Sequence, residues 1–376
     1  MLPYLTEKYG NPSSIHSYGQ EARAAVDRAR RQVATFIGAR PNEIVFTSGG
    51  TEANNLAIRG ICELAEQGRR HLIASEIEHP SVRGVITSLE KSGWEVTSLP
   101  VYENGIVRVE DVRAALRPET TLISVMMANN EIGTIQPINE IGGLVRVERE
   151  RRHRHCWFHV DAVQAAGRRP IDVALVGCDL LSLSAHKIYG PKGTGALFIR
   201  RGVRIKPQQT GGHQERERRA GTEPVANIVG FGAAADLARD EMNGRNEHTC
   251  RLRDRFESEI TRSIEEICFN GDREQRLPHL SNISFRFIEG EGLLIHLDMQ
   301  GVAVSTGSAC SSGTLEPSPV IRALHQNEEL ARGAIRFSFG KDNSDGDVDY
   351  VVHALSTAVE SLRRLSPLKR ETVTAI

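Results

Sequence analysis

The stretch CWFHVDAVQAAGRRPIDVALVGCDLLSLSAHKIYGPKGTGALFIR (residues 156–200) predicts the fold of the chain. Its three apolar runs, at 156–160, 179–184 and 195–200, have the continuous apolar character of strands that are buried on both faces. Chemically active residues follow two of these runs directly. In open α/β sheets, ligands bind beyond the carboxyl ends of the strands. The stretch therefore predicts a mostly parallel sheet with a ligand site at one edge.

The same pattern continues on the N-terminal side of this stretch, where apolar runs alternate with segments of helical spacing. The additional runs are EIVFT (43–47), HLIAS (71–75), EVTSLPV (95–101) and TLISVMM (121–127). Together the seven runs predict a seven-stranded, mostly parallel sheet in a large α/β domain. After about residue 240 the pattern changes to long amphipathic helices around NISFRF and AIRFSF. We predict a large domain over 14–240, and a smaller α+β domain formed by 1–13 and 241–376.

Composition excludes several classes of protein. The chain has 376 residues and a formal net charge of −1, so no global field attracts nucleic acid or an anionic membrane. No apolar run approaches the roughly 20 residues of a membrane helix, and the first residues do not resemble a signal peptide. The six cysteines form no CxxC pair and no metal-ligand spacing. We expect a cytoplasmic protein with no metal site, no membrane partner and no direct nucleic-acid partner.

A glycine-rich turn in FTSGGTEANNLAI (46–58) lies between a predicted strand and a predicted helix. Gly49 and Gly50 would let the backbone approach a ligand, and the helix start presents free N–H groups to an anion. Thr51 adds a hydroxyl group. The turn matches neither a dinucleotide-binding nor a Walker sequence, so a single phosphate is the better fit. A tight turn with Thr51 as helix N-cap explains these residues equally well.

Asp161 and Lys187 follow two of the predicted strands and would emerge at the same edge of the sheet. A carboxylate can hold a ring nitrogen protonated, and Gln164 could face the same ligand; taken alone, Asp161 is better explained as an N-cap. A desolvated lysine becomes a Schiff-base nucleophile, and Ser184 and His186 would supply hydrogen-bond donors beside it. Together with the glycine-rich turn, these groups could bind the three parts of pyridoxal 5′-phosphate: its phosphate, its protonated ring nitrogen and its aldehyde.

Cys310 lies in STGSACSSGTLEPS (305–318), a stretch too rich in Ser, Thr and Gly to pack a core. A thiol in a surface loop is accessible to a reactant, unlike a buried cysteine. Without the pyridoxal site, an ordinary small residue would be the better interpretation of Cys310.

Eight motifs resemble those of cysteine desulfurases of the NifS/IscS type, which are fold-type I pyridoxal-phosphate enzymes related to class V aminotransferases. They occur in the family's order and span nearly the whole chain. The serine-rich stretch around Cys310 resembles the branch with a long catalytic loop. The motifs are SGGTEANNLAI, EHPSV, NNEIG, HVDAVQAAG, SAHKIYGPKGTG, ERRAGTEPV, STGSACSSGTLEPS and IRFSFG.

The resemblance implies a role for each matching residue. The cofactor, pyridoxal 5′-phosphate, would be bound covalently by Lys187, paired at its ring nitrogen by Asp161, bonded at its ring hydroxyl by Gln164 and stacked upon by His79. The phosphate would be bound by Gly50, Thr51, Ser184 and His186, with Thr222 contributed by the second subunit of a homodimer. The substrate would be held by Asn130, which also borders the cofactor, and by Arg336, which would clamp its carboxylate. Catalysis would rest on Lys187, His79 and Cys310.

The implied activity converts L-cysteine to L-alanine and leaves the sulfur on Cys310 as a persulfide for an acceptor protein. Iron–sulfur cluster assembly, tRNA thiolation and DNA phosphorothioation all draw on this family. The alternatives are a selenocysteine lyase or an aminotransferase of the same fold, or a truncated, non-catalytic scaffold homologue. An aminotransferase would have no use for the thiol of Cys310, and a scaffold would have no use for the complete set of catalytic residues.

Two features depart from the family pattern. The first residues resemble the middle of the family's first helix, so we expect the native N-terminus to begin earlier. The segment 146–155 is unusually rich in arginine. We expect a solvated helix end or loop there, with a docking surface for an acidic partner as the alternative.

Overall fold

A computed structural model describes all residues of the chain except 67, 153–155, 307–316, 326 and 367–376. It divides the chain into two compact units. The larger unit comprises residues 1–99, 107–128 and 136–242. The smaller unit comprises residues 100–106 and 129–135 together with the C-terminal part from residue 243. Among the described helices, none combines the length and the apolar character needed to cross a membrane.

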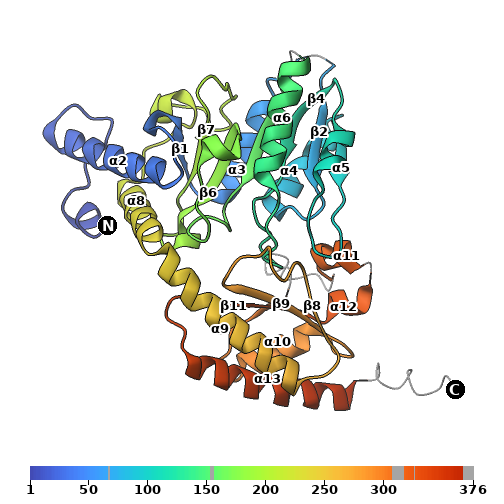
Figure 1. The fold of residues 1–376 in the computed structure, drawn as a ribbon. Helices are drawn as coiled ribbons and strands as arrows, with labels where there is room; N and C mark the ends of the chain where they lie inside the picture. The colour runs from blue at the N-terminus through green and yellow to red at the C-terminus, as the bar shows by residue number, and fades with distance from the viewer. Residues whose placement is uncertain (67, 153–155, 307–316, 326, 367–376) are drawn as a thin grey trace. The chain divides into compact units, whose positions relative to one another are not determined.

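The larger unit is built on a seven-stranded sheet with the order β1-β7-β6-β5-β4-β2-β3 (Figure 1). Strand β7 is antiparallel to both of its neighbours, and all other strands run in one direction. This arrangement confirms the predicted mostly parallel α/β sheet. The strands are β1 (Ile44–Thr47), β2 (His71–Ser75), β3 (Glu95–Leu99), β4 (Thr120–Ser124), β5 (Trp157–Asp161), β6 (Leu180–Ser184) and β7 (Gly195–Ile199).

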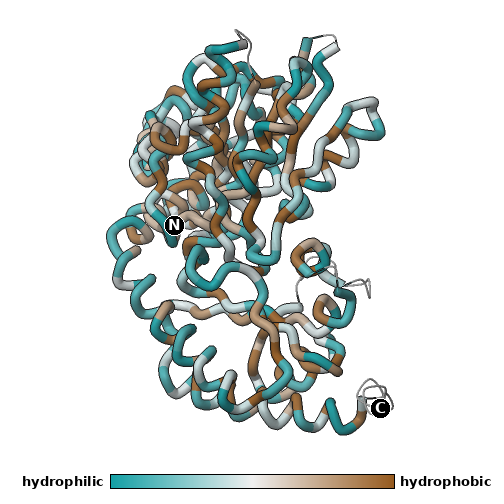
Figure 2. Tube along the Cα trace, turned by 45° about the vertical axis from the view of Figure 1, so that its right-hand side comes forward, coloured by the Kyte–Doolittle hydropathy of each residue, from teal (hydrophilic) through white to brown (hydrophobic). Residues whose placement is uncertain are grey.

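Helices cover this sheet because its strands, apart from the edge strand β3, are buried on both faces. Helices α3 and α4 share one apolar cluster with Leu72, Leu122 and Leu180 of the sheet. The neighbouring strand residues Ile73 and Ile123 point to the opposite face. In Figure 2, hydrophobic residues (brown) are concentrated in the interior of the larger unit, where the strands lie. The helices are α1 (Pro3–Thr6), α2 (Ser17–Phe36), η1 (Pro41–Glu43), α3 (Gly50–Cys62), α4 (Pro80–Glu90), α5 (Val109–Ala115), α6 (Ile138–Arg152), α7 (Val173–Val176), η2 (Ala185–Ile188), η3 (Gln214–Glu217) and α8 (Val225–Asp240).

The smaller unit packs helices onto a four-stranded antiparallel sheet with the order β10-β11-β9-β8. Phe256 of α9 contacts Phe337 of β11, with ring centroids 4.8 Å apart, at the centre of its core. The elements are α9 (Met242–Ser263), β8 (Ile267–Phe269), β9 (Leu280–Phe285), α10 (Gly290–Asp298), β10 (Ser305–Thr306), α11 (Pro319–His325), α12 (Glu328–Arg332), β11 (Ala334–Ser338) and α13 (Asp345–Leu365).

The observed units differ from the predicted domains at three places. Residues 100–106, predicted in the large domain, belong to the smaller unit. Residues 1–13 belong to the larger unit, because α1 packs against α8. Residues 129–135 belong to the smaller unit, because their backbone bonds to it: Ile135 N donates to Gln275 O over 2.8 Å, and Asn282 Nδ2 donates to Glu131 O over 3.0 Å. Asn130 and Arg336 are therefore parts of the same unit.

The arginine-rich run is partly neutralised within the larger unit. Arg149 pairs with the buried carboxylate of Asp179, and its guanidinium group lies 5.6 Å from the ring centroid of Trp157. Arg151 pairs with Glu148 over 2.8 Å. The prediction of a solvated run is therefore wrong for Arg149, whose side chain is only 14% exposed.

The helix η3 contains a left-handed turn. Its residues Glu215, Arg216 and Glu217 have φ values of 48°, 57° and 65°, which cost about 1–2 kcal/mol for each residue that is not glycine. Glu215 accepts two hydrogen bonds from Arg30 of α2, over 2.6 and 2.8 Å, and both side chains are buried. Removing one partner of a buried pair costs about 3–5 kcal/mol because the other charge is left buried and unpaired, so loss of either residue would destabilise this turn.

Candidate active site

The first turn of α3 lies against the ends of two central strands. A Cβ atom on Gly50 would lie 2.8 Å from Val163 Cγ2 and 3.5 Å from Ser184 Cβ. A Cβ atom on Gly195 would lie 2.7 Å from the carbonyl carbon of Gly49. Glycine at these positions lets the turn lie close to the sheet, so the free N–H groups at the start of α3 are placed beside the ends of β5 and β6.

Ser184 and His186 form a pair at the end of β6, because Ser184 Oγ lies 2.9 Å from His186 Nδ1. Burial lowers the pKa of His186, and the charges of Lys187 and Lys192 lower it further. The imidazole is therefore neutral at physiological pH, and its hydrogen bond to the hydroxyl orients the ring. Thr51 is exposed at the start of α3. These residues offer an anion both hydroxyl and ring N–H donors.

Asp161 ends β5 and is 5% exposed. Its Oδ2 accepts a hydrogen bond from Asn54 Nδ2 over 2.7 Å, and its Oδ1 accepts one from Val163 N over 2.9 Å. Burial raises the pKa of Asp161, although the two hydrogen bonds and the charges of His79 and Lys187 oppose the rise. A buried carboxylate of this kind needs a cationic partner, and a protonated ring nitrogen would provide one.

His79 is the N-cap of α4 and is joined to Asp161 by a chain of hydrogen bonds. Its Nδ1 accepts from Ser81 N over 3.1 Å and lies 2.8 Å from Ser81 Oγ. Asn54 Nδ2 donates to Ser81 Oγ over 2.9 Å and also to Asp161. Because Nδ1 accepts the backbone hydrogen bond, the neutral ring carries its proton on Nε2. Burial lowers the pKa of His79, which keeps the ring neutral.

Lys187 lies in η2, directly after β6. Its charge lowers the pKa of His79 and of His186, and it opposes the rise in the pKa of Asp161. The structure therefore brings the predicted lysine, carboxylate, ring-stacking histidine and phosphate-binding residues of the larger unit to one edge of its sheet. Gln164 is half-buried in the turn after β5, and Thr222 is exposed before α8; their roles stay predictions.

The smaller unit brings together the two predicted substrate residues. Arg336 of β11 donates from Nη1 to the backbone oxygen of Asn130 over 2.8 Å, and from Nη2 to Ser305 Oγ over 3.1 Å. These bonds orient the guanidinium group, and the contact uses the backbone of Asn130 rather than its amide. Cys310 lies outside the described residues.

Three residues of this site were not predicted from the sequence. Asn54 and Ser81 connect His79 with Asp161, as described above. Glu78 lies buried beside His79 in the chain, and its Oε1 accepts hydrogen bonds from Ser75 Oγ over 2.5 Å and from Met126 N over 2.8 Å. The available sequence signal was Pro80, which is typical of the first position of a helix and so makes His79 the N-cap, with Ser81 two residues further on.

We predict that Glu78 makes the stability of the protein depend on pH. Burial, with the charge of Asp161 adding to it, raises the pKa of Glu78 from 4.5 to about 8. Its contribution to the free energy of unfolding is therefore full below pH 4.5 and is lost as the pH rises to about 8, by up to about 1.4 kcal/mol per pH unit.

Glu78→Gln keeps the shape of the protonated acid and should remove this dependence. Urea unfolding of both proteins across the pH window measures it. We expect the variant to gain stability relative to the parent as the pH rises. A stability difference that does not change with pH would show that Glu78 is ionised in the folded protein.

The fold and the site define a class of protein: α/β enzymes that place a lysine, a buried carboxylate and an anion cradle at one sheet edge to bind pyridoxal phosphate. The model of the aminotransferase class-V family matches residues 1–351. The chain is 49% identical over 371 residues to the cysteine desulfurase IscS of Dictyoglomus turgidum, covering 99% of this chain and 93% of that relative. The chain belongs to the aminotransferase class-V family and, within it, to the cysteine desulfurases.

Solved structures agree with this family. A NifS-like protein superposes with a TM-score of 0.89 at 35% identity, covering 96% of this chain and 94% of that one. The protein SspA, solved in complex with cysteine, superposes with a TM-score of 0.78 at 34% identity, covering 91% of this chain and 94% of that one.

Proposed function

We propose that this enzyme uses pyridoxal 5′-phosphate to remove the sulfur of L-cysteine, releasing L-alanine and leaving a persulfide on Cys310. The observation that carries the proposal is the convergence of Lys187, Asp161 and His79 at one sheet edge, in a chain of the cysteine desulfurase family. A selenocysteine lyase, an aminotransferase or a scaffold homologue is not favoured, because relatives over nearly the whole chain are cysteine desulfurases.

The residues of the larger unit fit this cofactor. Asn54 Oδ1 is buried and has no hydrogen-bond partner among the described residues, so it can accept a bond from a ligand. Asp161 lies beside it as a buried carboxylate. Gly50 leaves space at the cradle that a Cβ atom would fill. The start of α3 thus offers a site for the phosphate. Asn54 and Asp161 offer an amide oxygen and a carboxylate to the cationic ring.

Each residue has a definite task in this proposal. Lys187 would bind the aldehyde group through its amine and move the Cα proton of the substrate. Asp161 would hold the proton on the ring nitrogen, and His79 would present its Nε2–H group. The cofactor would supply the electron sink that lets the Cα–H and C–S bonds of cysteine break.

Two further groups would act on the substrate itself. Arg336 would bind the substrate carboxylate. The thiolate of Cys310 would attack the substrate sulfur, so that an S–S bond forms as the C–S bond breaks. L-cysteine and the Cys310 thiol thereby become L-alanine and the Cys310 persulfide, with no external oxidant.

We further infer that the enzyme is a homodimer and passes the sulfur to an acceptor protein. Large apolar side chains are exposed along the N-terminal segment of the larger unit, which supports contact with a second copy. They are Leu2, Leu5, Tyr9, Ile15 and Tyr18, exposed by 70, 61, 78, 91 and 69%. The five described cysteines carry no disulfide, in keeping with the predicted cytoplasmic location.

Product analysis tests the proposed function. The purified protein with pyridoxal 5′-phosphate, L-cysteine and a thiol reductant should release alanine and sulfide in equal amounts. A keto acid in place of alanine would show an aminotransferase. Turnover of L-selenocysteine with none of L-cysteine would show a lyase, and no product from either substrate would favour a scaffold.

A further inference from the structure

Side chains of the segment 211–223 contact both the first turn of α3 and helix α2. At α3, Arg219 Nε donates to Glu52 Oε1 over 2.8 Å, and Arg219 Nη2 lies 3.3 Å from Glu52 Oε2. Glu52 lies in the first turn of α3, two residues after Gly50. Arg219 is therefore tied to the same helix turn that forms the candidate phosphate cradle.

Glu52 opposes the binding of an anion to this turn. Burial alone would raise the pKa of Glu52, but hydrogen bonds from Arg219 and Ser48 lower it overall, so the carboxylate is ionised at neutral pH. A carboxylate in the first turn stabilises the helix, and the same charge repels a phosphate at the neighbouring N–H groups. A phosphate site here therefore depends on a cation that cancels this charge.

Arg219 is that cation, and it is well placed for the task. The side chains of Arg219 and Glu52 are 17% and 23% exposed, so solvent screens their attraction less than in a surface pair. The guanidinium group also contacts both carboxylate oxygens, which fixes its position.

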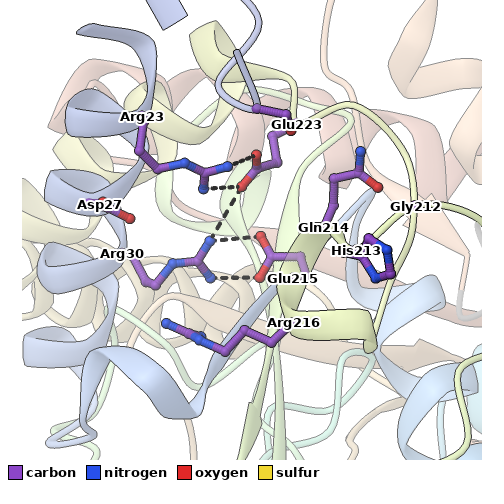
Figure 3. A pocket seen from close by; sticks show the side chains of 10 residues that line it. Arg23, Asp27, Arg30, Gly212, His213, Gln214, Glu215, Arg216 and Glu223 are labelled. Atoms are coloured by element: carbon purple, nitrogen blue, oxygen red, sulfur yellow. Dashed lines mark hydrogen bonds and ion pairs between the residues drawn. The ribbon is translucent and has the colours of Figure 1, made fainter. Parts of the chain in front are cut away.

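Three ion pairs hold the segment to α2, as Figure 3 shows: Arg30 with Glu215, Arg23 with Glu223, and Arg30 Nη2 with Glu223 Oε1 over 3.7 Å. Arg30 donates two hydrogen bonds to Glu215, and Arg23 donates two to Glu223 over 2.9 and 2.8 Å. The side chains of Glu215 and Glu223 are 2% and 3% exposed. A cavity of about 430 Å³ lies beside these pairs, bordered by Arg216. The left-handed turn thus lacks packing on that side, and the ion pairs hold it in place.

We propose that Arg219 is a cofactor-positioning residue: held in place by the Arg30–Glu215 pair, it cancels the charge of Glu52 and lets the first turn of α3 accept the phosphate dianion of pyridoxal 5′-phosphate. This inference rests on the proposed function, because it concerns the same cradle. It predicts that Arg219 affects the phosphate end of the cofactor and leaves the ring end unchanged.

The test compares the binding of pyridoxal 5′-phosphate and of pyridoxal, which lacks the phosphate, by absorbance titration. Arg219→Gln should weaken binding of the phosphate ester by about tenfold and leave pyridoxal binding unchanged. Glu52→Gln in the same chain should restore most of the loss, because the charge to be cancelled is gone. Arg218→Gln, which removes a neighbouring positive charge that does not contact Glu52, is the matched control and should bind both ligands normally. Glu215→Gln should reproduce the phosphate-specific loss, because it frees the turn.

Several outcomes would overturn the inference. Unchanged phosphate-ester binding by Arg219→Gln would remove it. An equal loss of pyridoxal binding, or no restoration in the double variant, would show that Arg219 only supports the fold of the segment. Normal binding by Glu215→Gln would remove the role of the ion pair. If the unmutated protein binds no pyridoxal 5′-phosphate, the proposed function fails first, so the two failures are distinguishable.

Discussion

Lys187→Ala is expected to lose the covalent attachment of pyridoxal 5′-phosphate, together with at least about a thousandfold of the alanine-forming rate. The reason is the position of the lysine in η2, where its charge acts on Asp161, His79 and His186. Borohydride should fix the cofactor to the parent protein at Lys187 and to no residue of the variant. The cradle and Asp161 remain in the variant, so weak non-covalent binding should persist.

Lys187→Arg is the matched control for this experiment. Arginine keeps the positive charge among Asp161 and the two histidines, but its guanidinium group does not form the covalent bond at neutral pH. It should therefore lose the attachment as completely as the alanine variant does. Reductive fixation at another lysine in either variant would contradict the assignment of Lys187.

Cys310→Ser should leave cofactor binding intact and reduce alanine release to a trace. A serine hydroxyl is a far poorer nucleophile toward sulfur than a thiolate near neutral pH. The variant should still change its absorbance when L-cysteine is added, because the residues that bind cofactor and substrate are unchanged. In the parent protein, limited alkylation should label Cys310 first and stop turnover.

The other cysteines are the controls for Cys310. Burial raises the pKa of Cys62, of Cys178 and of Cys268, so their thiols are poor nucleophiles at neutral pH. Cys268→Ser should keep normal alanine release. Normal release by Cys310→Ser would remove the desulfurase mechanism, and a reaction that needs no thiol would take its place.

The sheet and the residues at its edge could be predicted from the sequence, because both follow from local patterns. Each apolar run formed a strand, and the strand direction placed Asp161 and Lys187 at the same edge. Gly50 and Ser184 lie together for the same reason.

The connecting residues could not be predicted, because their partners are distant in the chain. Asn54 meets Asp161 across 107 positions, and Arg219 meets Glu52 across 167. Hydrophobic periodicity and short motifs carry no information about pairs that are so far apart in the sequence. The same limit explains the domain boundary: Asn282 bonds to Glu131 across 151 positions, which assigns 129–135 to the smaller unit.

The most direct test of the central claim is mass analysis of the protein after a single turnover with L-cysteine and no reductant. The account predicts one alanine released per active site and one extra sulfur atom on the peptide that contains Cys310. The extra mass should disappear when a reductant is added, with release of sulfide. Alanine released with no sulfur on Cys310, or with the sulfur on another cysteine, would contradict the account.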